Sequence, residues 1–181
     1  MRTVKRKKGF TLLELVIYIG LSLIVLAALV SFAWVLIQDQ TKQDAITEVA
    51  DQGRFVLDTM TYHAQRAQSI DAATVYATNP GLLRIKFTAD PDIVFDTYQK
   101  SVSVGGQNFT ITKLRMTEIG NPSVDLTSDD IDVTNFQLTN VSGASAASVQ
   151  VNLTLESLNP SQSSSYESQK SWTTTVTLRA R

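Results

Sequence analysis

The chain has 181 residues, which allows one domain of ordinary size in addition to a membrane anchor. It contains no cysteine, so disulfide bonds, thiol chemistry and thiolate metal sites are excluded. The formal net charge is −1, but five of the 16 basic residues lie within residues 1–9. The rest of the chain has 11 basic and 17 acidic residues, a formal charge of −6, which argues against direct nucleic-acid binding.

A basic leader at the N-terminus is followed by a long apolar segment. Residues 15–37 are 23 residues without a charge, enough to cross about 30 Å of hydrocarbon. The positive charge before this segment predicts a single-pass protein with its N-terminus in the cytoplasm and the chain after Ile37 outside. Glu14 lies just before the segment, where an unpaired carboxylate is disfavoured by up to roughly 3 kcal/mol. We therefore expect Glu14 to have a partner.

A cut between Gly9 and Phe10 would create a positively charged amino terminus within reach of a carboxylate on the same or a neighbouring helix. The arrangement resembles the class III signal of type IV pilins and type II secretion pseudopilins, in which the leader ends in Gly, the mature chain begins with Phe, and Glu is its fifth residue. Gly9, Phe10 and Glu14 match these positions. The resemblance implies cleavage by prepilin peptidase and methylation of Phe10. It also implies that Phe10 and Glu14 act in subunit assembly.

An ordinary secretory signal and a plain membrane anchor are the alternative interpretations of this segment. The apolar run is longer than the 7–15 residues typical of a secretory signal, and cleavage after Ala33 would leave an apolar end on the mature chain. A plain anchor explains the length and orientation, but it gives no role to Gly9, Phe10 or Glu14.

Residues 38–70 continue the helical pattern with less hydrophobic residues, so one helix is predicted from about Leu12 to Ser69. Its membrane half comprises residues 10–37 and its exposed half residues 38–70. A narrow stripe of the exposed half is expected to pack on the rest of the domain. The stripe comprises Ile46, Val49, Gly53, Val56, Met60, His63, Ala67 and Ile70. Gly53 costs about 1 kcal/mol relative to alanine within a helix, so close packing or a local bend is expected there.

Residues 50–57, followed by Arg66 and Ala67, resemble the helix of the minor pilin PilW and pseudopilin J group. This resemblance implies a minor subunit in a tip or initiation complex, whose partners are other pilin or pseudopilin subunits. A major pilin subunit and a single-pass surface-binding protein are the alternatives. The resemblance implies a location in the cytoplasmic membrane, followed by assembly into a periplasmic or extracellular filament.

Residues 71–181 contain short runs rich in Val, Ile, Thr, Phe and Tyr, separated by turn residues, as is typical of antiparallel strands. Gly105 and Gly106 predict a two-residue hairpin turn. The predicted strands are 83–88, 93–99, 101–104, 107–115, 131–140, 148–157 and 171–179, with 142–147 and 159–168 as loops. The predicted class is α+β and pilin-like, with one antiparallel sheet packed on the exposed half of the helix.

The sequence indicates no enzyme and no cofactor. His63, the single histidine, lies on the packed stripe and is expected to be structural. Asp125, Asp129, Asp130 and Asp132 supply hard oxygen ligands for a weakly supported calcium site. Their order does not match an EF-hand loop, and a glycine is missing at the turn. Short acidic clusters before strands are usually solvated caps or turns, so no metal site is assigned.

Overall fold

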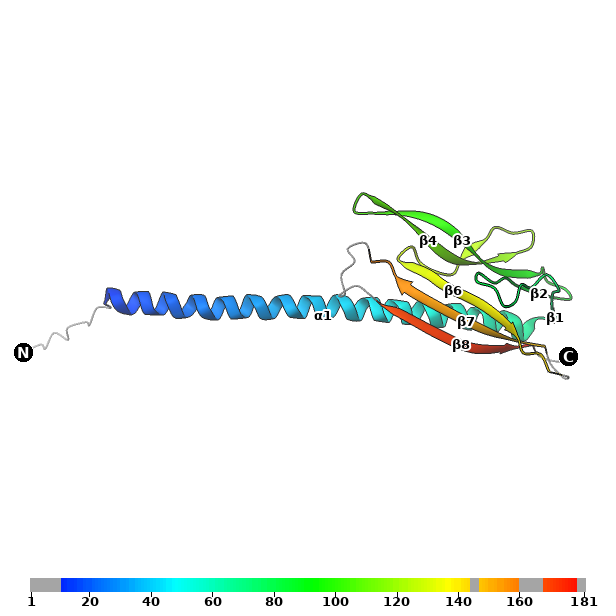
Figure 1. Cartoon of the computed structure of the whole chain (residues 1–181), viewed down its shortest axis with the longest axis horizontal. Helices are drawn as coiled ribbons and strands as arrows, with labels where there is room; N and C mark the ends of the chain where they lie inside the picture. The colour runs from blue at the N-terminus through cyan, green and yellow to red at the C-terminus, as the bar shows by residue number, and fades with distance from the viewer. Residues whose placement is uncertain (1–10, 144–146, 160–167, 179–181) are drawn as a thin grey trace, which may run out of the picture. The chain divides into compact units, whose positions relative to one another are not determined.

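The computed structural model describes residues 11–143, 147–159 and 168–178, and these form one helix and eight strands (Figure 1). The helix up to Gln40 belongs to one compact unit, and the chain from Thr41 onward forms a second. The elements are α1 (Leu12–Arg66), β1 (Ser69–Ile70), β2 (Leu83–Lys86), β3 (Ile93–Val104), β4 (Gln107–Glu118), β5 (Val124–Asp125), β6 (Ile131–Asn140), β7 (Ser148–Ser157) and β8 (Gln169–Thr177).

The sequence predicted that the helix ends at about Ser69, but α1 ends at Arg66. The next residues form a short strand, because Gln68 donates its backbone N–H to Lys86 at 2.8 Å and Asp71 donates to Arg84 at 2.9 Å. Ile70, which was expected on the helical stripe, therefore lies in β1 opposite β2. The α+β class itself is confirmed.

The strands form two antiparallel sheets instead of the single predicted sheet. The first has the order β1-β2-β3-β4-β5, and the second has the order β6-β7-β8. The two are separate because side chains take the backbone donors on the β4 edge that faces β6. Thr112 donates its N–H to the Asp132 carboxylate at 2.7 Å, and Leu114 donates to the Thr127 hydroxyl at 3.2 Å. These bonds satisfy the β4 donors without a backbone ladder to β6.

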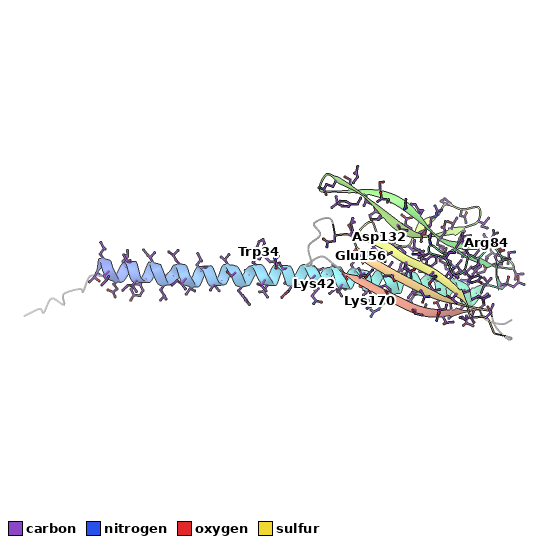
Figure 2. The ribbon with its side chains drawn as sticks, viewed as in Figure 1. Trp34, Lys42, Arg84, Asp132, Glu156 and Lys170 are labelled. Carbon is purple, nitrogen blue, oxygen red and sulfur yellow. The ribbon has the colours of Figure 1, made fainter. Side chains whose placement is uncertain are left out.

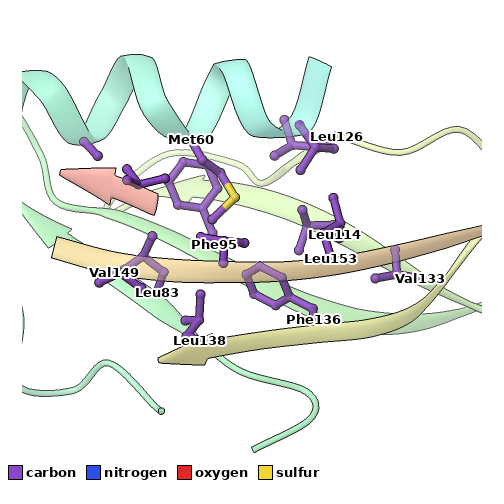
Figure 3. Packing of buried hydrophobic residues seen from close by; sticks show 14 of the residues in the cluster. Met60, Leu83, Phe95, Leu114, Leu126, Val133, Phe136, Leu138, Val149 and Leu153 are labelled. Carbon is purple, nitrogen blue, oxygen red and sulfur yellow. The ribbon is translucent and has the colours of Figure 1, made fainter. Parts of the chain in front are cut away.

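The exposed half of α1 buries one face against both sheets. Val49, Val56 and Met60 are fully buried, and each such side chain contributes about 1.5–3 kcal/mol by leaving water. Figure 3 shows Met60 among Phe95 and Leu114 of the first sheet and Phe136 and Leu153 of the second, which belong to one apolar cluster. Both sheets and the helix thus share a single core.

The ends of the predicted stripe differ from its centre. Ile46 remains 38 % exposed, whereas Ala67 is buried. His63 is half-buried, and its neighbour Ala64 is buried instead. The stripe was predicted from helical spacing alone, and the contacts made by its two ends depend on where the strands lie.

Gly53 is a site of close packing rather than an interruption of α1. The indole ring of Trp172, from β8, lies directly against it. A Cβ atom at Gly53 would be 2.3 Å from Cη2 of Trp172 and 2.5 Å from its Cζ2, closer than such atoms can approach. Trp172 is only partly buried, and Lys170 lies over its ring at 5.6 Å from the centroid. Gly53 therefore allows the last described strand to approach the helix.

The predicted hairpin turn is confirmed. Gly105 and Gly106 have φ angles of 61° and 82°, and the two positive values are those of a type I′ turn. The segments 93–99 and 101–104 form one continuous strand, β3, which pairs with β4 along its whole length.

The later strands follow the predicted boundaries closely. β6 and β7 begin and end where they were predicted, and β8 begins two residues earlier, at Gln169. The predicted end of that strand, Arg179, lies outside the described residues, as do parts of the two predicted loops. The two-residue strands β1 and β5 were not predicted.

Candidate functional site

The helix α1 begins with Thr11 as its N-cap. The Thr11 hydroxyl accepts a hydrogen bond from the Glu14 backbone N–H at 3.3 Å, and the Thr11 carbonyl accepts one from Leu15 at 3.2 Å. A threonine at the N-cap with a glutamate three residues later is a typical helix start. The structure thus explains why the helix begins at Leu12. Gly9 and Phe10, the predicted cleavage and methylation positions, lie outside the described residues.

Glu14 is placed on the surface of the first helical turns. Its side chain is partly buried, and Tyr18, one turn further along, donates a long hydrogen bond of 3.5 Å from its hydroxyl to the Glu14 carboxylate. A neutral phenol does not neutralise a carboxylate, so this contact leaves the charge of Glu14 available for a cationic partner.

The helix after Glu14 exposes apolar side chains on every side. The large apolar residues between Leu15 and Ile37 are each 46–69 % exposed, Trp34 among them (Figure 2). Of the described residues, α1 provides the one segment long and apolar enough, by length and composition, to cross a membrane. An apolar surface of this size needs lipid or other subunits around it.

Comparison with known families places a motif on this same segment. Residues 4–30 match the model of the prokaryotic N-terminal methylation motif. The chain carries a prepilin-type signal. Comparison with curated proteins and with solved structures gave no match. The signal supports a precursor of the type IV pilin class that is processed by prepilin peptidase and assembles with other pilins.

The prepilin-type signal also fits the exposed apolar part of α1, since a subunit of this class is anchored in a membrane before it enters a surface filament. The motif is consistent with a structural subunit. The match covers residues 4–30 and does not extend to the rest of α1 or to the strands.

The four aspartates of the predicted calcium site do not converge. Asp125 and Asp129 contact the ammonium group of Lys113, Asp132 accepts the N–H of Thr112, and the backbone carbonyl of Asp130 accepts the N–H of Leu158. Among the described residues, no three acidic or histidine side chains lie close enough to hold a metal ion. The arrangement therefore differs from the predicted calcium site.

Lys113 supplies the positive charge between Asp125 and Asp129. Its side chain is 4 % exposed, and Nζ lies 2.9 Å from Asp125 Oδ2 and 2.6 Å from Asp129 Oδ1. Tyr98 donates its hydroxyl to Asp125 at 2.8 Å, and Lys100 Nζ lies 2.8 Å from Asp129. The network ties β3 and β4 to the segment that leads into β6.

The network changes the acidity of its members in a consistent way. Burial disfavours the charged form of Lys113, but the bonds to Asp129 and Asp125 outweigh it and raise the pKa of the lysine. Hydrogen bonds from Lys100 and Lys113 lower the pKa of Asp129. Burial opposes the ionisation of Asp125, yet the bonds from Lys113 and Tyr98 prevail and lower its pKa. All three groups are therefore charged at neutral pH.

His63 lies among aromatic side chains at the end of α1. Its ring meets Tyr62 edge to face at 5.1 Å between centroids and is 6.3 Å from Phe95. Burial lowers the pKa of His63, a nearby Glu118 opposes this effect and Arg66 reinforces it. The imidazole lines a cleft of about 290 Å³ together with Tyr62, Arg66 and Glu118. The contacts are those of a packing residue.

Trp172 and Lys113 are two residues whose importance the sequence did not indicate. Trp172 stands in a run of serine and threonine with no local signal that links it to Gly53. Lys113 interrupts an otherwise alternating strand, and its position between Ile111 and Leu114 could have marked it as a buried charge that needs a partner.

Proposed function

We propose that the chain is a minor subunit of a type IV pilus or of a type II secretion pseudopilus. In this proposal prepilin peptidase cleaves the precursor between Gly9 and Phe10, Phe10 is methylated, and the mature subunit enters a filament through its apolar helix. The observation that carries the proposal is the N-terminal methylation motif over residues 4–30, followed by a capped helix with exposed apolar side chains.

Glu14 has a specific role in this proposal. Its carboxylate neutralises the amino terminus of a neighbouring subunit, since a charge near the lipid boundary is tolerated when it is paired with an opposite charge. The half-buried side chain at the start of α1 supports this role, and so does the absence of any basic residue from 12 to 37.

The resemblance of residues 50–57 to the PilW and pseudopilin J group supports a place in a tip or initiation complex. Gly53 of this segment packs against Trp172 within the chain. The opposite, exposed face of the helix is left for contacts with other subunits. Contacts with unlike subunits start a filament rather than close a ring. In sheared filaments, a minor subunit is expected to be scarce relative to the principal one.

The proposal is tested by expressing the full chain with and without prepilin peptidase in cells that assemble the filament. Mass spectrometry of the wild-type chain is expected to show a methylated Phe10 at the mature N-terminus when the peptidase is present. Glu14→Gln should be inserted and cleaved normally, but its amount in filaments should fall by about tenfold, which corresponds to about 1.4 kcal/mol.

The matched control is Glu14→Asp, which keeps the charge and should lose less. A functional filament subunit that keeps residues 1–9 would contradict the proposal as a whole. Normal incorporation of Glu14→Gln would contradict only the pairing of Glu14.

A further inference from the structure

The hairpin of β3 and β4 extends beyond the strands on either side of it (Figure 1). β2 pairs with β3 only as far as Phe95, whereas β4 pairs with β3 from Ile93 to Val104. If the pairing of β2 with β3 continued in the same register beyond Phe95, Gly81 would lie opposite Thr97. Gly81 instead donates its N–H to Phe136 of β6 at 2.7 Å, so the chain leaves β3 at this point.

The register shows which backbone groups of β3 face the edge that β2 leaves unpaired. Leu114 pairs with Thr97, and its own N–H and carbonyl bond to Thr127 and Leu126 on the side away from β3. In an antiparallel ladder, paired residues point their backbone groups either toward or away from each other. Thr97 therefore points its N–H and carbonyl away from β4.

The same alternation applies to every second residue up to the turn. The backbone groups of Thr97, Gln99, Ser101 and Ser103 all face the free edge, and no described residue pairs with them there. Gln99, Ser101 and Ser103 are exposed. The edge spans about 20 Å at the usual rise of a strand.

A cleft of about 320 Å³ lies beside the first part of this edge. Three consecutive residues of β3, Thr97, Tyr98 and Gln99, line it together with Thr112 of β4. Asn79, Pro80 and residues of β6 form the opposite side, and no lysine, arginine or carboxylate is among the described lining residues. The cleft therefore suits an uncharged chain segment.

Natural proteins usually protect such an edge with proline, a bulge or an inward-pointing charge. Residues 97–103 contain no proline, and their pairing with β4 is regular. Their single charged residue, Lys100, is held by Asp129. A row of alternating donors and acceptors is complementary to another extended backbone.

We propose that the free edge of β3, residues 97–103, accepts an extended, uncharged strand from a neighbouring, unlike subunit of the filament. The inference rests on the proposed function and adds a contact that the apolar helix does not make. Pairing between two copies of this chain is disfavoured. The register that joins all four residues to their counterparts would place Lys100 opposite Lys100 of the second copy, and like charges directly opposite are destabilising.

Ser101→Pro tests the proposal, and Ser101→Ala is its matched control. Proline at this position removes an outward N–H and places its ring on the edge, while the bonds between β3 and β4 remain. Alanine removes the same side chain and keeps the N–H. We expect Ser101→Pro to enter filaments about tenfold less than Ser101→Ala, because a main-chain bond is lost and the ring blocks the incoming strand.

Val102→Pro serves as the misfolding reference, since it breaks the ladder to β4, and circular dichroism in micelles should separate it from Ser101→Pro. Amide hydrogen exchange supplies a second measurement on the full chain. The outward amides of Thr97, Gln99, Ser101 and Ser103 should exchange rapidly in the isolated chain and slowly in filaments.

The outcomes separate the two proposals. Absence of the wild-type chain from filaments would contradict the proposed function. Its presence there, with rapid exchange at the four outward amides and equal amounts of the two Ser101 variants, would overturn strand addition alone. Slow exchange in micelles together with cross-linked dimers would assign the edge to a second copy and overturn the choice of partner.

Discussion

The indole ring of Trp172 occupies the space beside Gly53 that a side chain would need. Gly53→Ala therefore has two opposed effects. The helix gains up to about 1 kcal/mol from the better helix former. The new methyl group displaces the indole, and overpacking of this kind costs about 1–3 kcal/mol. We expect a net destabilisation of about 1 kcal/mol, measured by thermal unfolding of the full chain in micelles with circular dichroism.

The Trp172→Ala background provides the control for this prediction. With the indole absent, the methyl group has room, so Gly53→Ala should then stabilise the chain by up to about 1 kcal/mol. The same sign in both backgrounds would show that the contact with Trp172 does not decide the identity of residue 53.

The sequence predicted that Gly53 has a structural reason, but it could not identify Trp172. The helical stripe shows that a glycine interrupts a packed face, and this information is local. The residue that packs against it lies on the last described strand and is brought there by the pairing of β7 with β8. Contacts of this kind follow from the topology rather than from any short pattern.

Lys113 joins two structural elements, β4 and the segment before β6, through its bonds to Asp125 and Asp129. Replacement by methionine keeps most of the volume and removes the charge. We expect Lys113→Met to lower the free energy of unfolding at pH 7 by about 1–2 kcal/mol. This is less than for a fully buried pair, because both carboxylates are partly exposed and regain water.

The network also makes the stability of the chain depend on pH. The network lowers the pKa values of Asp125 and Asp129 from the ordinary value of an aspartate, so their contribution to stability is fully present well above that ordinary value. It is lost as the pH falls further, through the folded-state values. Acid titration followed by circular dichroism should show a smaller loss of stability below pH 4 for Lys113→Met than for the wild type.

The control for charge alone is Lys42→Met, since Lys42 is exposed on α1 and forms no ion pair with another described residue. Its titration curve should match that of the wild type. Equal acid sensitivity of the wild type and Lys113→Met would mean that other carboxylates govern acid unfolding.

The helix, strands and turn that were predicted correctly are those that depend on residues close together in the sequence. The Gly105-Gly106 turn follows from residues that accept positive φ angles, and β6 and β7 follow from alternating apolar residues. The division into two sheets was missed because it depends on Asp132 and Thr112, which are distant in sequence. The surroundings of the four aspartates could not be predicted for the same reason. The acidic cluster is visible in the sequence, but the cation that neutralises it, Lys113, comes from β4.

The whole molecule combines a prepilin-type signal with a separate folded unit, and its two tryptophans report on each part. Trp34 lies in the exposed apolar part of α1, and Trp172 lies in the unit that begins at Thr41. In vesicles that contain lipids brominated on the acyl chains, we expect strong quenching of Trp34 fluorescence and little quenching of Trp172. The measurement compares Trp172→Phe with Trp34→Phe, each of which keeps one tryptophan. Equal quenching of the two tryptophans would contradict the expectation that residues 15–37 lie in the membrane and the folded unit does not.

The packing of β8 on α1 also has a consequence in time. The helix is synthesised first, and β8, the strand that covers it at Gly53, is synthesised long after it. The face of α1 at Gly53 therefore stays uncovered until β8 is available to pack against it. Contacts between such distant residues form late, and exposed apolar surface invites association before they do. The folded unit therefore remains open to unwanted association until β8 has joined the helix.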